Sequence, residues 1–298
     1  MTADRAVAAA VQATAFLAAA CRAAELARPA PRVRDELAPR FVAARPAHLP
    51  DYRALLAAGG EEVVARTALL DAVLAETLAI AAARGRAPVL VNLGAGFCTR
   101  PYRLDLSACQ LVLELDAAPV LEIKAGVLAG ATASAPVQRV GLDLRDQDGL
   151  AVTLASRCAQ ADSVIVLSEG LLPYLPVEAV ATLAATLAQV GEASWLTDLV
   201  CTASAQGMAQ LARVAGVTLP LYGLDTLAPV ESSGWAVVDY RILPVARRTP
   251  LAGGRPGGGS GRVGGQGARA SHGVVDGVVV LHHTGGGQPE PGRTSPDS

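Results

Sequence analysis

The residues best placed to do chemistry are two glycines and three acidic residues that follow short apolar segments: Gly94, Gly96, Asp116, Asp143 and Glu169. A turn without side chains lets a ligand approach the backbone, and a helix that follows it presents unpaired N–H groups. Carboxylates at neighbouring strand ends can accept hydrogen bonds from ribose hydroxyls or from the exocyclic amine of adenine. Together these residues predict a site for a cofactor that contains a nucleoside.

The positions of Asp116 and Asp143 in the sequence predict which group of the cofactor each one contacts. Asp116 ends the segment LVLELD, 20 residues after Gly96, which leaves room for a turn, a helix and a strand. We expect Asp116 to face an open cleft and to accept from both ribose hydroxyls, with Glu114 as the alternative ligand if the register differs. Asp143 and Leu144 end the next strand-like segment, where they would contact adenine.

A dinucleotide cofactor is the main alternative, because nicotinamide oxidoreductases share the strand, turn and helix of this pattern. Their fingerprint has a third glycine three residues after the second, which lets the helix pack closely. Thr99 occupies that position here. The short loop therefore favours a nucleoside with an amino-acid tail, as in S-adenosylmethionine, over a pyrophosphate.

The segments that must position these residues alternate between strand-like and helical patterns. Apolar runs predict strands at 89–96, 111–116, 138–144, 163–170, 194–201, 235–243 and 273–283. Helical patterns separate the later strands at 119–130, 147–159 and 177–190. This alternation predicts an α/β fold of Rossmann-like type, with a mostly parallel seven-stranded sheet and helices on both faces.

Composition divides the chain into three parts. Residues 1–84 contain helical patterns at 5–27 and 61–84 and predict an N-terminal helical cap. Residues 85–246 form the predicted cofactor-binding α/β domain. Residues 247–298 are rich in glycine and predict a flexible tail, which either contributes the last strand at 273–283 or is a disordered appendage outside the sheet.

Charge and cysteine content exclude several classes of function. The formal net charge is -2 and the pI is near 6.1, so the chain has no basic field for nucleic acid or for an anionic membrane. Five cysteines without a CxxC pair indicate reduced thiols, and we expect a cytoplasmic protein. No cluster of histidines and carboxylates suggests a catalytic metal.

Seven segments carry a resemblance to a known family. They are TAFLAAACRAAE, DELAPRFV, VVARTALLD, NLGAGFCTRPYRL, LELDAAPVLEIK, GLDLRD and SEGLLPYL, and they occur in the family's order between about residues 14 and 245. In these segments the sequence resembles the leucine carboxyl methyltransferase-like family. That family has the class I fold of S-adenosylmethionine-dependent methyltransferases and includes bacterial O-methyltransferases associated with polyketide pathways.

The resemblance implies a role for each site residue. Arg66, together with Arg22 from the first helix, would hold the methionyl carboxylate of S-adenosylmethionine, a task that suits a guanidinium fork. Gly94 and Gly96 would line the methionine-binding loop, and Asp116 would take the ribose hydroxyls. Asp143 and Leu144 would contact the adenine, and Glu169 would lie near the amino end of the cofactor. Without the resemblance, both arginines would be interpreted as solvated helix residues.

The acceptor is less constrained by the sequence. Of the four histidines, only His48 lies in the part that resembles the family, and the sequence identifies no catalytic residue. A carboxylate needs no base because it is already ionised at neutral pH. We therefore expect O-methylation of a carboxylate or a hydroxyl of a small-molecule or peptide-like acceptor. Cys98 replaces the family's usual aspartate, so a non-catalytic protein that binds S-adenosylmethionine remains an alternative.

Overall fold

The computed structural model describes the chain except for residues 1–2, 48, 50–52, 215–217, 244–272 and 286–298. Its centre is a seven-stranded sheet in the order β3-β2-β1-β4-β5-β7-β6. The strands are β1 (Val89–Leu93), β2 (Leu111–Asp116), β3 (Val137–Gly141), β4 (Val164–Ser168), β5 (Glu192–Leu199), β6 (Ala236–Ile242) and β7 (Gly277–Thr284). β1 to β5 pair in parallel, whereas β7 runs antiparallel between β5 and β6.

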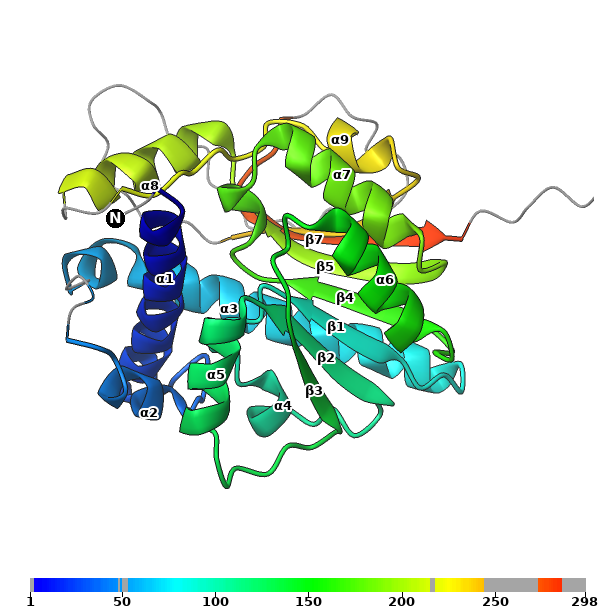
Figure 1. The fold of residues 1–298 in the computed structure, drawn as a ribbon, viewed down its shortest axis with the longest axis horizontal. Coiled ribbons are helices and arrows are strands. Elements are labelled where there is room, and N and C mark those ends of the chain that lie inside the picture. The colour runs from blue at the N-terminus through cyan, green and yellow to red at the C-terminus, as the bar shows by residue number, and fades with distance from the viewer. Residues whose placement is uncertain (1–2, 48, 50–52, 215–217, 244–272, 286–298) are drawn as a thin grey trace, which may run out of the picture.

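The described helices cover the sheet on both sides (Figure 1). They are α1 (Ala3–Leu26), α2 (Ala38–Ala43), α3 (Arg53–Ala83), α4 (Arg100–Arg103), α5 (Ala118–Val127), α6 (Gln147–Cys158), α7 (Val177–Ala188), α8 (Thr202–Val214) and α9 (Ala228–Glu231), with a 3-10 turn η1 (Leu172–Tyr174). Buried side chains of α6, α7 and α9 share one apolar cluster with the sheet, and those of α3 share another. The expected α/β fold, with its mostly parallel sheet and helices on both faces, is confirmed.

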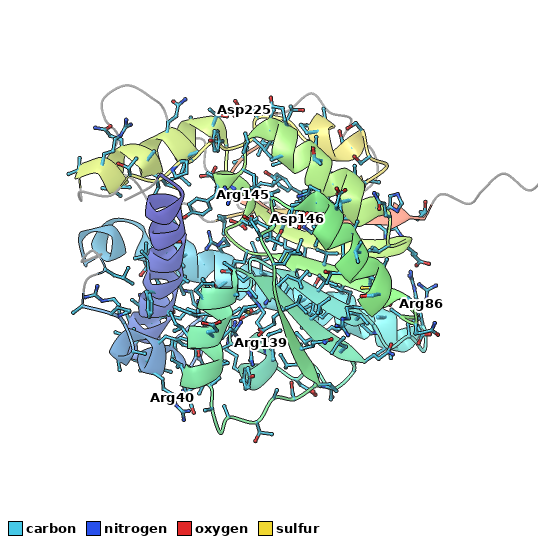
Figure 2. All side chains as sticks on the ribbon, viewed as in Figure 1. Arg40, Arg86, Arg139, Arg145, Asp146 and Asp225 are labelled. Carbon is cyan, nitrogen blue, oxygen red and sulfur yellow. The ribbon has the colours of Figure 1, made fainter. Side chains whose placement is uncertain are left out.

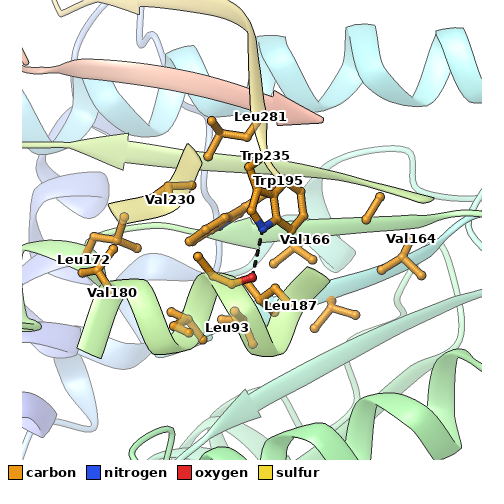
Figure 3. Close-up of a cluster of buried hydrophobic side chains, with 14 of the residues drawn as sticks. Leu93, Val164, Val166, Leu172, Val180, Leu187, Trp195, Val230, Trp235 and Leu281 are labelled. Carbon is orange, nitrogen blue, oxygen red and sulfur yellow. Dashed lines mark hydrogen bonds between the residues drawn. The ribbon is translucent and has the colours of Figure 1, made fainter. Parts of the chain in front are cut away.

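The pattern of α7 shows why these segments form helices. Val180, Leu183, Ala184 and Leu187 recur at helical spacing, and all four are buried against the sheet. Figure 3 shows this cluster around Trp195, whose indole N–H donates to the hydroxyl of Ser168 at 2.9 Å. The pairing satisfies a polar group that the core would otherwise leave without a partner.

The strands β1, β3, β4 and β5 end earlier than the apolar runs predict, and at β1 and β4 glycine conformation explains the difference. β1 ends at Leu93 because Gly94 has φ of +62°, and β4 ends at Ser168 shortly before Gly170, which has φ of +65°. Only glycine adopts this left-handed region without strain. The chain therefore turns away from the sheet at both points, and each turn begins a loop of the site.

The N-terminal helices pack against the loop that follows β1. Phe97, in that loop, lies with its ring centroid 4.6 Å from that of Phe16 on α1 and 4.6 Å from that of Phe41 on α2. Aromatic contacts of this kind bury large apolar areas. The helical cap thus meets the sheet at its carboxyl edge. The domain boundaries at 84 and 246 remain predictions, and residues 247–272 and 286–298 lie outside the described part.

Candidate functional site

The predicted site residues lie where the strand order reverses, at the carboxyl ends of β1 and β4. Chain connections leave β1 and β4 toward opposite faces of such a sheet, and ligands bind in the crevice between them. Figure 2 labels Arg86, just before the amino end of β1, and Arg145, just after the carboxyl end of β3. The two residues therefore indicate the amino and carboxyl ends of the parallel strands. Because β1, β2 and β4 pair in parallel, the glycine loop, Asp116 and Glu169 all lie at the carboxyl ends of the strands, the end at which Arg145 lies.

The glycine loop is folded tightly against the end of β2. Gly94 and Gly96 both have positive φ, +62° and +40°. The amide of Ala95 donates to the carbonyl of Leu115 at 3.1 Å, and the amide of Gly96 donates to Asp116 Oδ2 at 2.7 Å. The loop is therefore held to the neighbouring strand by two of its own backbone amides, one bonded to a carbonyl and one to the Asp116 carboxylate.

Asp116 differs from expectation in its exposure. Its second oxygen accepts from the amide of Ala117 at 2.7 Å, and the residue is only 9% exposed, so it does not face an open cleft. Burial raises the pKa of Asp116, although the hydrogen bonds from Gly96 and Ala117 oppose the shift. Each carboxylate oxygen has a second acceptor position, so the group can still receive ribose hydroxyls.

Glu114, two residues earlier on the same face of β2, has a different environment. It is fully buried and pairs with Lys124 Nζ at 2.7 Å and with Arg139 Nε at 2.9 Å. Both partners are protein side chains. The two acids of LELD therefore differ in the structure: Glu114 forms internal ion pairs, and Asp116 binds the glycine loop.

Asp143 lies further out than the other acids. Its carboxylate is 54% exposed and receives hydrogen bonds from Arg145, including one from Nη2 at 2.7 Å. These bonds lower the pKa of Asp143. The amide of Leu142 donates to the carbonyl of Asp116 at 2.9 Å, which brings the two strand ends together. Leu144 is half-buried and packs against the apolar cluster under α6 and α7.

Glu169 and Arg66 form a largely enclosed charge network at the ends of β4 and β5. Arg66 Nε lies 3.4 Å from Glu169 Oε1, and Arg66 Nη1 lies 3.2 Å from Asp198 Oδ2. Arg100 Nη2 lies 2.7 Å from Glu169 Oε2, and Thr67 Oγ1 donates to Glu169 at 2.5 Å. Although burial raises the pKa of Glu169, Arg100 and Arg66 hold it well below its usual range.

Arg22 is buried and linked to the glycine loop. The residue is 5% exposed, its Nε donates to Asp35 at 2.8 Å, and its Nη2 donates to the carbonyl of Phe97 at 2.7 Å. Asp35 in turn accepts from Thr99 Oγ1 at 2.7 Å. These contacts tie α1 to both ends of the loop segment Phe97 to Thr99.

Sequence reasoning missed several residues of this network, namely Asp35, Thr67, Asp71, Arg100 and Asp198. Arg100 is 2% exposed and bridges Asp71 on α3 and Glu169. Asp198 is fully buried at the end of β5 and accepts from the amide of Gly170 at 2.6 Å. The usable signal is position in the sequence, since Asp198 lies in the second half of the strand predicted at 194–201 and Arg100 directly follows the segment Gly94 to Thr99.

Tyr174 of η1 was also missed. Its hydroxyl is hydrogen bonded to the side chain of Thr14 on α1 and lies near Arg66. Burial raises the pKa of Tyr174. The loop after β4 therefore touches the cap helix beside the charge network.

The described part of the chain has neither a cluster of metal ligands nor a membrane-spanning helix. No three histidine, cysteine, aspartate or glutamate side chains among them gather closely enough to hold a metal ion. None of the helices described combines the length and apolarity that crossing a membrane requires.

Comparisons with known proteins agree with the motifs. A curated protein of Mycobacteroides abscessus, provisionally named an S-adenosyl-L-methionine-dependent methyltransferase, is 38% identical over 174 residues, 56% of this chain and 56% of that protein. A protein of Mycobacterium marinum with the same name is 37% identical over 185 residues, 57% of this chain and 58% of that protein. The match therefore spans little more than half the length of these relatives.

A solved structure supports the fold. A DUF574 family protein from Streptomyces avermitilis aligns with a TM-score of 0.53 at 14% identity, covering 91% of this chain and 97% of that one. The family described as leucine carboxyl methyltransferase matches residues 15–188, which run from α1 through the glycine loop and Asp116 to the end of α7. The resemblance carried by the seven segments is thus confirmed, and this chain belongs to the leucine carboxyl methyltransferase family.

Proposed function

We propose that the protein is an S-adenosylmethionine-dependent O-methyltransferase that acts on a carboxylate or an acidic hydroxyl of a small-molecule or peptide-like acceptor. Family membership and the names of the relatives support methyl transfer from S-adenosylmethionine. The preference for an already ionised acceptor comes from the titration behaviour of the groups at the site.

The residues present suit the chemical groups of the cofactor. A carboxylate suits the two ribose hydroxyls and a guanidinium suits the methionyl carboxylate. Two of the five N–H groups of Arg22 are engaged with Asp35 and Phe97, which leaves donors for a ligand. The proposed cofactor residues are Arg22, Arg66, Gly94, Gly96, Asp116, Asp143, Leu144 and Glu169.

S-adenosylmethionine, when bound, supplies a methyl group that is already electrophilic. The protein then has to align donor and acceptor and to exclude water, and needs no nucleophile of its own. In this proposal Arg66 holds the methionyl carboxylate of the cofactor, and Asp116 holds its ribose. The buried network of Glu169, Arg100 and Asp198 keeps Arg66 in place.

The observation that carries the acceptor class concerns the groups that could take a proton. The pKa of Glu169 is held well below its usual range, so it is a weak base, and the pKa of Tyr174 is raised, so its hydroxyl is already protonated near neutral pH. Burial raises the pKa of Asp198 and Asp116, but Asp198 is held by Arg66 and the Gly170 amide, and Asp116 by two backbone amides. The two described histidines lie on β7, where His282 pairs with Ser194 and His283 with Ala193, at the amino end of β5. An acceptor that arrives ionised fits such a site.

Methyl transfer to a cell extract tests the proposal. The protein is incubated with S-adenosylmethionine labelled in the methyl group, and the product is then treated with mild alkali. Methyl esters release labelled methanol under these conditions and methyl ethers do not, so volatile label identifies a carboxylate. Alkali-stable label excludes a carboxylate acceptor, and mass spectrometry of the labelled product then shows whether the methyl group is on a hydroxyl oxygen or on nitrogen, sulfur or carbon. Absence of transfer by a protein that still binds S-adenosylhomocysteine would leave a non-catalytic binding protein.

Cofactor choice is tested by thermal denaturation. A ligand that binds only the native state raises the melting temperature by mass action. We expect S-adenosylhomocysteine to raise it and NAD and NADP to leave it unchanged, because Thr99 stands in place of the third glycine. A larger shift with a dinucleotide would favour the oxidoreductase alternative.

A further inference from the structure

The only lysine of the chain, Lys124, is fully buried on α5 beneath the glycine loop. Its ammonium group lies 2.7 Å from Glu114 Oε1 and donates to the carbonyl of Ala95 at 3.1 Å. Ala95 stands between the two glycines of the loop. The lysine therefore contacts the proposed cofactor loop through a backbone atom.

Charge balance alone does not account for this lysine. Glu114 already has a second cation, Arg139, with Nε at 2.9 Å, and the side chain of Arg139 is 23% exposed. Burying a further ammonium group is costly unless hydrogen bonds repay the loss of water. The contact that Lys124 makes and Arg139 does not is the one with Ala95.

The Ala95 carbonyl belongs to the same peptide unit as the Gly96 amide. A trans peptide is planar, and its C=O and N–H point in opposite directions. Lys124 binds the oxygen of this unit, and Asp116 Oδ2 accepts from its N–H at 2.7 Å. One peptide plane is thus held between a cation and a carboxylate, at a glycine with φ of +40°.

We propose that Lys124 is a positioning residue for the cofactor: by holding the Ala95 carbonyl it orients the Gly96 amide, and the amide sets the Asp116 carboxylate for the ribose hydroxyls. This inference rests on the proposed binding of S-adenosylmethionine at Asp116. Glu114 holds the ammonium group through one carboxylate oxygen, and Arg139 pairs with the other oxygen of Glu114.

The single lysine allows a direct spectroscopic test in the unaltered protein. Labelling lysine Nζ with ¹⁵N gives one side-chain ammonium signal, which belongs to Lys124. We expect S-adenosylhomocysteine to shift this signal and to slow the exchange of its protons with water, because the ligand tightens the peptide unit that the ammonium group holds. A lysine that serves only the core would keep the same shift and exchange rate.

Two variants separate positioning from stability. The double variant Lys124→Met with Glu114→Gln removes the buried pair without leaving a lone charge on either residue, and loses the bond to Ala95. We expect its affinity for S-adenosylhomocysteine to fall about tenfold, which corresponds to about 1.4 kcal/mol. The matched control, Arg139→Met, removes the other cation of Glu114 and should change the affinity by less than about twofold.

The outcomes distinguish this inference from the proposed function. If the wild-type protein does not bind S-adenosylhomocysteine, the cofactor site is wrong and the role of Lys124 falls with it. If the wild-type protein binds but the ammonium signal stays unchanged, the positioning role alone is overturned. Wild-type affinity in the folded double variant would overturn it as well.

Discussion

The backbone amide of Gly96 donates a 2.7 Å hydrogen bond to Asp116 Oδ2, which joins the loop after β1 to the end of β2. The same carboxylate accepts from Ala117 through its other oxygen at 2.7 Å. Asp116 therefore has a structural task besides its proposed contact with the ribose. This double role changes what a substitution there should do.

Asp116→Ala should weaken binding of S-adenosylhomocysteine on the order of ten- to a hundredfold. A hydrogen bond to a charged group contributes roughly 1.5–3 kcal/mol, and each 1.4 kcal/mol is about tenfold in affinity. Asp116→Asn should lose less, because its amide oxygen still accepts. Isothermal titration calorimetry measures the affinity of both variants for S-adenosylhomocysteine. Normal binding by Asp116→Ala would remove the ribose contact from β2.

The same substitution should also lower stability, contrary to what an exposed aspartate would do. Asp116→Ala removes the acceptor of two backbone amides at a site that is 9% exposed. Each such bond is worth about 1 kcal/mol. Urea denaturation of the cofactor-free protein measures the loss, and Asp105→Ala at an exposed position serves as the control. An unchanged midpoint would show that water replaces these bonds freely.

Binding of S-adenosylhomocysteine should weaken in mild acid. Ribose hydroxyls donate to the ionised carboxylate, so protonation of Asp116 removes the acceptor. Burial raises the pKa of Asp116, so affinity should begin to fall at a higher pH than an ordinary aspartate, with a pKa of about 3.9, would produce. Calorimetry at about pH 7 and about pH 4.5 tests this. Asp116→Asn should lack the dependence, and an equal dependence in that variant would assign it to another group.

Arg66→Lys tests the proposed contact with the methionyl carboxylate. The structure argues against Arg66→Ala for this purpose, because that change would leave Asp198 buried without its cation, at a cost of about 3–5 kcal/mol. Lysine keeps the charge but loses the planar fork. We expect affinity for S-adenosylmethionine to fall about tenfold and affinity for adenosine to stay the same.

The control for Arg66→Lys is Arg28→Lys, an exposed ion-pair position on the loop after α1. It should leave both ligands unaffected. Equal losses of S-adenosylmethionine and adenosine in Arg66→Lys would mean that Arg66 acts through the packing of the site.

A chain that ends at Arg248 should aggregate. Such a chain lacks β7, which pairs with β5 on one side and β6 on the other and buries Val278, Val279 and Leu281. Its loss would expose the edge of β5 and apolar surface on both faces. Light scattering and gel filtration measure the outcome, with a chain ending at Gly285 as control. A soluble, cofactor-binding protein ending at Arg248 would contradict the need for β7.

The sequence by itself determined the order of the elements and the places where the chain turns. Continuous apolar runs such as VLVNL and VIVLS predict buried parallel strands because both faces of those strands are covered. Glycines at 94 and 170 then end the strands, since the left-handed conformation is open to them. These signals are local, and the structure confirms the seven strands that they predict.

Only the tertiary structure decided which charged residues contact one another. Helical spacing alone does not distinguish Arg22 and Arg66 from solvated residues. In the structure Arg22 is buried beside Asp35, and Arg66 is largely buried between Glu169 and Asp198, which come from distant segments. Likewise, Glu114 and Asp116 look equivalent at a spacing of two. They differ because Lys124 on α5 pairs with the first while the glycine loop folds onto the second. Such choices depend on contacts between segments far apart in the chain, which strand and helix periods do not encode.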